Sequence, residues 1–201
     1  MTDSTNPESK IALRKYYLDQ YPEDSPPKIL DCFTGEEQTI FRALYSKIPG
    51  SVALDLKLIQ GAKKIDAKKY IPKHANQFDF FDLDAYGSPF EIIANIAYFR
   101  RNNAQSFVIC ATETSFLKYG HVHHATKVMQ LAMNNKSNIP IPGLYKFYDE
   151  IIGWILLMIA RKWNYQIEDA KMINGDTGNM NYFGFRMTPI PDETIKGSHN
   201  V

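Results

Sequence analysis

Four short apolar runs in the first half of the chain each end at an aspartate. They span residues 28–31, 51–55, 64–66 and 78–84, and their acids are Asp31, Asp55, Asp66 and the pair Asp82 and Asp84. Runs this short and apolar are typical of strands that are buried on both faces of a parallel sheet. Because parallel strands end at the same edge of a sheet, the pattern predicts that these acids gather at one edge.

Helical segments alternate with these strands. Residues 38–48 follow the first strand and its turn, and residues 89–101 follow the fourth, with Ser88 placed to cap that helix. Residues 106–111 predict a fifth, fully apolar strand. The alternation favours an α/β protein with helices on both faces of a mostly parallel sheet.

The two ends of the chain depart from this alternation. Residues 11–20 predict a helix that the prolines after it end, and residues 148–163 predict a long apolar helix. Residues 165–173 and 180–187 predict two strands that a turn-rich connector joins into an antiparallel hairpin. We therefore expect an N-terminal tail and helix (1–27), one main domain (28–190) and a C-terminal tail (191–201).

Composition bounds what such a domain can do. The chain has 201 residues, 44% of them hydrophobic, which is enough for one substantial core. Its 23 lysines and arginines balance 22 acids, so contact with nucleic acid would have to come from local patches. Cys32 and Cys110 lie in apolar runs, which favours reduced thiols in a cytosolic protein. The polar N-terminus lacks the layout of a signal peptide, so we expect a cytoplasmic location.

The turn after the first strand indicates which cofactor the acids would suit. Gly35 lets the backbone approach a ligand closely, and Asp55 is placed to accept hydrogen bonds from ribose hydroxyls. The turn lacks the glycine repeat of dinucleotide-binding proteins, and Glu36 and Glu37 would repel a pyrophosphate. Charge therefore favours the cationic methyl donor S-adenosylmethionine over NAD. The alternative is that Asp31 and Asp55 only cap helices and bind nothing.

The most distinctive stretch is Asp-Leu-Asp-Ala-Tyr-Gly-Ser-Pro at residues 82–89. It combines two acids, an aromatic ring, a glycine and a Ser-Pro pair that can start a helix, which is more than a structural turn requires. It resembles the tRNA guanine-N2 dimethyltransferase family, whose members carry D-L-D-P-[FY]-G-S-P at the same place. Only the proline differs, and Ala85 stands there.

The resemblance extends over roughly residues 28–187. Asp66 and Ala67 are similar to the family's D-A after the third strand, and residues 108–113 to its V-T-A-T-D run. Residues 150–161 loosely resemble its E-x-x-x-R-x-L-L helix, and residues 181–186 its closing H-Y-x-R-x strand. The resemblance implies a Rossmann-like class I methyltransferase fold, with a mostly parallel seven-stranded sheet and a C-terminal antiparallel hairpin. It also implies S-adenosylmethionine as the cofactor.

The resemblance further implies two groups of site residues. The cofactor-binding group is Asp31, Phe33, Gly35, Asp55, Asp66, Ala67 and Asp82, and the acceptor group is Asp84, Ala85, Tyr86 and Gly87. Asp31 and Gly35 would line the methionine end of the donor, Asp55 the ribose and Asp66 the adenine amine. Asp84 and the carbonyl of Ala85 would accept hydrogen bonds from the acceptor amine, and Tyr86 would stack on a flipped base.

Together these features predict a methyltransferase that acts on an exocyclic amine of a nucleic-acid base. Guanine N2 in tRNA or another RNA is the first choice, DNA or a small molecule is the second, and a partner protein could supply RNA binding. Glu37 replaces the second glycine of the usual donor loop, and the segment between Asp55 and Asp66 is too short for a full helix. A non-catalytic binding module that keeps the fold is therefore the alternative from a different class.

Two further clusters have plainer interpretations. His121, His123 and His124 lack a cysteine or acid at a ligand spacing, so a loop facing solvent or phosphate is favoured over a metal site. Five lysines and a histidine lie between residues 63 and 74, and Arg100 and Arg101 follow later. We expect these basic residues to form a solvated face, with phosphate contact as the alternative.

Overall fold

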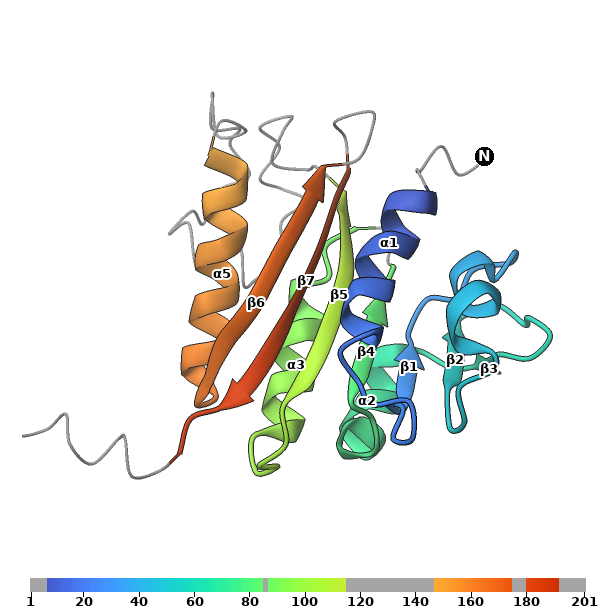
Figure 1. Cartoon of the computed structure of the whole chain (residues 1–201), viewed down its shortest axis with the longest axis horizontal. Helices are drawn as coiled ribbons and strands as arrows, with labels where there is room; N and C mark the ends of the chain where they lie inside the picture. Colours follow the sequence, from blue (N-terminus) through green and yellow to red (C-terminus); the bar gives the residue numbers. More distant parts are fainter. Residues whose placement is uncertain (1–6, 85–86, 115–146, 175–179, 192–201) are drawn as a thin grey trace, which may run out of the picture.

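The computed structural model describes residues 7–84, 87–114, 147–174 and 180–191. Its strands are β1 (Ile29–Asp31), β2 (Val52–Asp55), β3 (Lys63–Lys64), β4 (Phe80–Leu83), β5 (Phe107–Thr114), β6 (Tyr165–Asn174) and β7 (Met180–Pro189). Its α-helices are α1 (Pro7–Leu18), α2 (Ala67–His74), α3 (Phe90–Arg100) and α5 (Tyr148–Lys162). These strands form one seven-stranded sheet in the order β3-β2-β1-β4-β5-β7-β6, with helices packed against it (Figure 1).

The strand directions confirm the predicted fold class. β1 pairs in parallel with β2 and β4, β2 with β3, and β4 with β5. β7 is antiparallel to both of its neighbours, β5 and β6, so the hairpin of β6 and β7 closes the sheet. The predicted mostly parallel sheet with a C-terminal antiparallel hairpin is therefore correct.

The connections on either side of β2 are less helical than predicted. The helix expected at residues 38–48 is reduced to a π-helical turn, η1 (Phe41–Tyr45). Gln38 has a φ of 54°, a left-handed conformation that cannot belong to a right-handed helix. No helix is found between β2 and β3, where the whole connection is described, in agreement with the short spacing in the sequence.

Two details at helix starts were not predicted correctly. The helix α2 was not expected at all, because Pro72 lies inside it; Asp66 caps it by accepting a hydrogen bond from the backbone nitrogen of Lys68 (2.9 Å). The residue that caps α3 is Pro89 and not Ser88, and it makes no side-chain capping bond. Pro72 makes the α2 sequence look unlike a helix, because proline is unfavourable inside one. Pro89 has the fixed φ that suits the start of α3.

Two layers of core lie on opposite faces of the sheet. Leu30, Phe81 and Ile109 point towards α2, α3 and α5, whereas Phe80 and Val108 point towards α1 and η1. Successive residues of a strand point to opposite faces of the sheet. The side chain of an acid near a strand end therefore lies on the same face as the side chain two residues before it. Asp82 therefore lies on the α1 face of the sheet.

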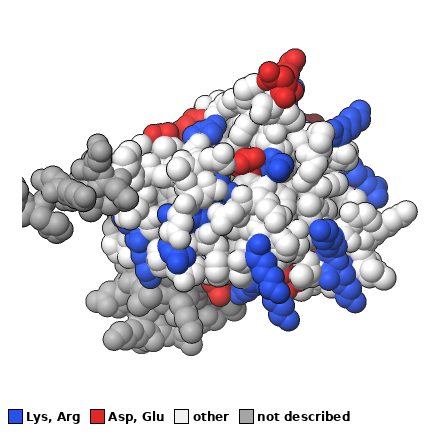
Figure 2. Space-filling model, turned by 90° about the horizontal axis from the view of Figure 1, so that it is seen from below, with Lys and Arg blue, Asp and Glu red and all other residues white. Residues whose placement is uncertain are grey.

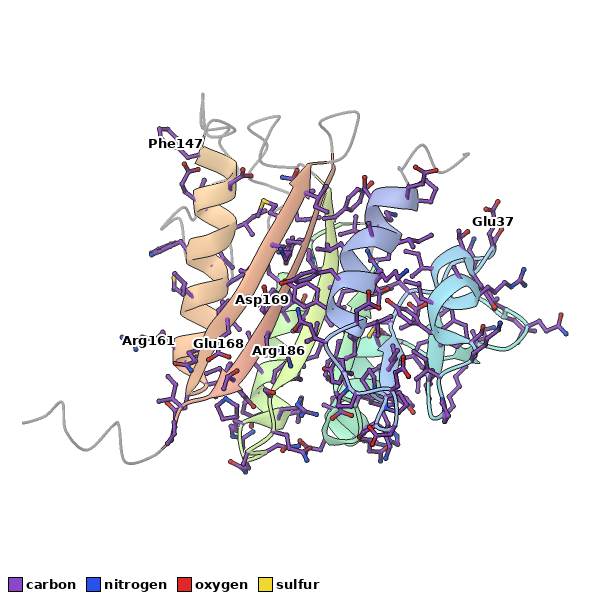
Figure 3. The ribbon with its side chains drawn as sticks, in the orientation of Figure 1. Glu37, Phe147, Arg161, Glu168, Asp169 and Arg186 are labelled. Atoms are coloured by element: carbon purple, nitrogen blue, oxygen red, sulfur yellow. The ribbon has the colours of Figure 1, made fainter. Side chains whose placement is uncertain are left out.

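The N-terminal helix α1 is joined to the sheet at the C-terminal strands as well. A bulge in β6 includes Asp169, labelled in Figure 3, which has a φ of 49°. The carboxylate of Asp169 accepts hydrogen bonds from Tyr16 (2.8 Å) and Gln20 (2.6 Å). The buried Tyr17 hydroxyl donates to the carbonyl of Asp169 and, at 2.6 Å, to that of Gly184. This helix is therefore an integral layer of the domain.

Gly184 is the point at which α1 and β7 approach most tightly. A Cβ added there would collide with the ring of Tyr17 and would lie 3.2 Å from Cys110 Sγ. We expect Gly184→Ala to lower the free energy of unfolding by about 1–3 kcal/mol, as overpacking of a tight core does. Urea denaturation followed by circular dichroism measures this loss.

Gly153 provides the matched control. It lies in α5, and a Cβ there would meet nothing within 4 Å. Because alanine is the better helix former, Gly153→Ala should leave stability unchanged or raise it by up to about 1 kcal/mol. Equal losses in the two variants would show that the contact with Tyr17 does not explain the effect.

Cys32 and Cys110 are both buried and free, as the sequence predicted. Among the helices that the structure describes, none combines the length and the apolar character needed to cross a membrane.

Candidate functional site

The parallel strands β1, β2, β4 and β5 end at the same edge of the sheet, the upper edge in Figure 1, and three of the predicted acids lie at or beside these strand ends: Asp31, Asp55 and Asp82. Asp31 at the end of β1 is the register partner of Asp82 on β4. The chain leaves β1 towards β2 on one side, whereas β4 lies on the other, so this is the topological switch point where open α/β sheets bind ligands. Asp55, at the end of β2, borders the same edge.

Asp82 is held by two buried partners on the α1 face. Arg14 of α1 donates to it through Nε and Nη2, both at 2.6 Å, and the Tyr45 hydroxyl donates at 2.7 Å. Burial opposes the charge of Arg14, but the carboxylate of Asp82 outweighs this and raises the pKa of Arg14. Both oxygens of Asp82, a predicted cofactor-binding residue, are thus engaged by protein groups.

Asp84 lies two residues further along, at the rim of the edge. Lys10 Nζ lies 2.9 Å from both carboxylate oxygens, and the Thr112 hydroxyl donates to Oδ1. Burial opposes ionisation of Asp84, but the charges of Arg14 and Lys10 outweigh it, so the pKa of Asp84 is lowered. Lys10 also lies 5.4 Å from the centre of the Tyr182 ring.

Asp31 differs from these two acids because no lysine or arginine of the described residues pairs with it. It is buried, and its Oδ1 accepts a hydrogen bond from the backbone nitrogen of Phe33 (3.2 Å). Burial, and then the negative charge of Asp82, raises the pKa of Asp31 well above its ordinary value. Asp31 is therefore a buried carboxyl group without a lysine or arginine partner among the described residues, next to two acids that have one.

The turn after β1 is fastened to the end of β2. Gly35 has a φ of 68°, which explains the glycine, and its nitrogen donates to Asp55 Oδ2 (3.1 Å). The backbone nitrogen of Lys57 donates to Asp55 Oδ1 (2.8 Å). A Cβ on Gly35 would meet nothing within 4 Å, so the left-handed φ and not close packing requires glycine here.

The two glutamates of this turn are surface residues. Glu36 pairs with Lys57 at 2.5 Å on the surface. Glu37 is exposed, and Figure 3 shows it at the outer end of its loop, pointing away from the sheet.

Of the other predicted site residues, Phe33, Ala67 and Gly87 are described by the structure, and Ala85 and Tyr86 are not. Ala67 is buried in α2 directly after the capping Asp66, and Phe33 is half-buried against the main core. Gly87 has a φ of 111°. Ala85 and Tyr86 lie outside the described residues, so the acceptor side of the site is represented by Asp84 and Gly87.

The basic run is solvated, as the sequence suggested, with exposed side chains at Lys63, Lys64, Lys68, Lys69 and Lys73, but Arg100 does not belong to this face. Arg100 is fully buried: its guanidinium lies 4.7 Å from the Phe107 ring centre and donates to the carbonyls of Ala75 (2.9 Å) and Phe78, so it cannot meet a phosphate. Lys68 pairs with Glu91 at 2.8 Å. Figure 2, seen from below, shows lysine and arginine side chains spread separately over the face opposite the site.

Metal binding at the histidine cluster is not addressed, because residues 121–124 lie outside the described part of the chain. Within the part that is described, His, Cys, Asp and Glu side chains form no group of three that could hold a metal ion.

Sequence reasoning missed the residues that hold the acids. The buried face of α1 is formed by Lys10, Leu13, Arg14 and Tyr17. Two basic residues four apart, between apolar residues at helical spacing, are the signal that was available. The two basic residues pair with Asp82 and Asp84, which are two residues apart at the end of β4. The sequence analysis did not recognise this pairing.

Known proteins share the fold with this chain but little of its sequence. No protein-family model matches the chain, and no curated protein matches it significantly. Trm1 from Pyrococcus horikoshii, solved with S-adenosyl-L-methionine, superposes with a TM-score of 0.62 at 15% identity, over 95% of this chain and 58% of Trm1. This chain thus spans under two thirds of the length of Trm1.

Two other similar structures cover both chains almost fully. A putative hemolysin from Lactococcus lactis has a TM-score of 0.54 at 13% identity, over 92% of this chain and 91% of its own. The putative methyltransferase yhhF from Escherichia coli has a TM-score of 0.50 at 11% identity, over 94% and 90%. Identities this low establish a shared fold alone. This chain has the Rossmann-like fold of the class I methyltransferases.

Proposed function

We propose that this protein binds S-adenosylmethionine at the carboxyl edge of its sheet and methylates an exocyclic amine of a nucleic-acid base. The observation that carries the proposal is the buried carboxyl group of Asp31, which has no cationic partner among the described residues. A strongly perturbed acid in such a place marks a candidate functional site. A cation that entered beside it would stabilise its ionised form.

The residues around Asp31 fit this donor. Asp31 and Gly35 would hold the amino-acid end, where the ammonium and sulfonium charges match the free carboxyl group. Asp55 would accept hydrogen bonds from the ribose, because each of its oxygens accepts one backbone hydrogen bond and a carboxylate oxygen has a second lone pair. Asp66 and Ala67 would border the adenine, and Phe33 would form part of the wall.

The acceptor would approach from the side of Asp84. The donor supplies an electrophilic methyl group bound to a positively charged sulfur. The acceptor nitrogen would take this methyl group with its own lone pair, the electrons of the broken bond would stay with the donor, and the nitrogen would release a proton to water. Asp84 would orient an N–H of the amine by accepting a hydrogen bond, with the Ala85 carbonyl as second acceptor and Tyr86 stacked on the base.

The choice of substrate rests on residues 82–89, which resemble the guanine-N2 motif. Guanine N2 in tRNA or another RNA is therefore the first substrate to test, followed by DNA and small molecules. Because lysines and arginines barely outnumber the acids over the chain, a partner protein that supplies RNA-binding surface belongs to the proposal.

A non-catalytic binding module is the second candidate. Two observations favour it: no helix connects β2 and β3, and Lys10 already occupies hydrogen-bonding positions on Asp84. A module of this kind would keep the fold and would not transfer a methyl group.

Calorimetric titration with S-adenosylmethionine and S-adenosylhomocysteine separates the two candidates. We expect the wild-type protein to bind both, and NAD, the control ligand, to remain unbound. Labelled donor and unmodified tRNA transcripts then test transfer, and Asp84→Ala should bind the donor and lose turnover. Absence of binding by a folded protein would favour the non-catalytic module; full turnover by Asp84→Ala would remove Asp84 from the acceptor site.

A further inference from the structure

Helix α1 presents two cations to two acids of β4 with matched spacing. Lys10 and Arg14 are one helical turn apart, which is about 6 Å along the axis. Asp84 and Asp82 are two residues apart on one face of the strand end, which is about 6.6 Å. The helix and strand run in opposite directions, so Arg14 meets Asp82 inside the protein and Lys10 meets Asp84 at the rim.

The two ion pairs differ in their access to solvent. The Arg14 and Asp82 side chains are 0% and 1% exposed, and Tyr45 closes the remaining side. The Lys10 side chain is 5% exposed, whereas that of Asp84 is 21% exposed. The inner pair is therefore sealed, and the outer pair leaves its carboxylate open towards the edge where the site lies.

Asp84 retains room for another donor. A carboxylate offers about four lone-pair positions. Lys10 lies near both oxygens and Thr112 donates to Oδ1, so Oδ2 carries less of this hydrogen bonding than Oδ1. An N–H group that reaches the edge can bond to this oxygen without displacing Lys10.

We propose that Lys10 is a positioning residue that fixes the orientation and the negative charge of the Asp84 carboxylate at the acceptor side of the site. This inference rests on the proposed function, and it assigns to α1 a part in the reaction. Asp84 then acts as a fixed hydrogen-bond acceptor that aligns the amine. An acid held ionised by a lysine is a weak base, so the proton lost after transfer goes on to water.

Cations and acids among the described residues both act on Asp84. Lys10 and Arg14 approach from α1, Asp82 precedes it on β4, and Asp31 adds a further acid from β1. Arg14 is committed to Asp82 through two hydrogen bonds. Without Lys10, burial and the two neighbouring acids would raise the pKa of Asp84. Only Arg14, which is already bonded to Asp82, would oppose that rise.

The direct test is the pKa of Asp84, measured by carbon-13 NMR of aspartate-labelled protein. The Asp84 signal is the one that Asp84→Asn removes. Lys10→Met should raise the pKa of Asp84 by about 1–3, as loss of an opposite charge within contact distance does. Lys10→Arg should restore the wild-type value, and Lys15→Met, which removes an exposed lysine of the same helix, should leave it unchanged.

Two binding and rate measurements complete the test. Lys10→Met should bind S-adenosylmethionine within about threefold of wild type, whereas transfer to tRNA should fall by up to about sevenfold at pH 6 and further at pH 5, because the acid limb of the pH–rate profile moves to higher pH. An unchanged Asp84 pKa in Lys10→Met would overturn the inference. Failure of the wild-type protein to bind the donor would instead overturn the proposed function, and the NMR result would still decide whether Lys10 controls Asp84.

Discussion

Replacement of Arg14 by methionine is expected to lower the free energy of unfolding by about 3–5 kcal/mol. The change removes the only cation that bonds to Asp82 among the described residues, and it leaves that carboxylate fully buried. The Tyr45 hydroxyl can donate one hydrogen bond but cannot balance a charge. At about 2–4 °C per kcal/mol for a chain of this size, the melting temperature should fall by roughly 6–20 °C.

Two further variants separate charge from packing. Arg42→Met removes an exposed arginine of η1 and should change stability by less than about 0.5 kcal/mol. Arg14→Met combined with Asp82→Leu removes the buried charge altogether and should recover most of the loss. If the double variant is as unstable as the sum of its two single changes, the two side chains are not coupled and the explanation is wrong.

Asp31→Asn is expected to stabilise the free protein and to weaken donor binding. Because the pKa of Asp31 is raised in the folded protein, the folded state holds its proton over a pH range in which the unfolded chain has lost it. This contribution to stability is therefore present at acidic pH and is lost as pH rises from the ordinary aspartate pKa through the folded value. At pH 7 the neutral amide, which can still accept from Phe33, should gain roughly 1–3 kcal/mol.

Donor affinity should change in the opposite direction. Loss of a charge-assisted contact to the donor's cation should weaken S-adenosylmethionine binding about 10- to 100-fold. Calorimetry in two buffers with different ionisation enthalpies should reveal proton release on binding to wild type and none with Asp31→Asn. Asp19→Asn, an exposed control, should alter neither property. A destabilised Asp31→Asn at pH 8, or wild-type affinity, would contradict the role of Asp31.

Local patterns were sufficient to predict the sheet and its acidic edge. Apolar runs ending in Asp31, Asp55 and Asp82 can be recognised within a few residues of sequence, and the alternation of such runs with predicted helices was enough to indicate the parallel pairing, although the connections around β2 proved less helical. Segments whose backbone departs from local preference were not predicted. Gln38 adopts a left-handed conformation that its residue type does not signal, and Pro72 lies inside a helix.

Long-range pairing explains the other differences. Lys10 and Asp84 are 74 positions apart, and Arg14 and Asp82 are 68 apart, so no local pattern connects them. Arg100 looked like a surface charge until the fold enclosed it between aromatic rings and carbonyls. A basic residue within an apolar helix face can equally well mark a solvated side or a buried partner, and only the tertiary structure distinguishes the two.

The place of β7 between β5 and β6 has a consequence for the newly made chain. β6 leaves the ribosome before β7, yet it can join the sheet only through β7. Until β7 emerges, the hydrogen-bonding edge of β5 that β7 covers, which includes Phe107 and Ile109, lacks its partner among the described strands. If translation pauses before β7 has emerged, the uncovered apolar edge of β5 can pair with other chains and aggregate. Uninterrupted translation of β7 would therefore lower the risk of aggregation.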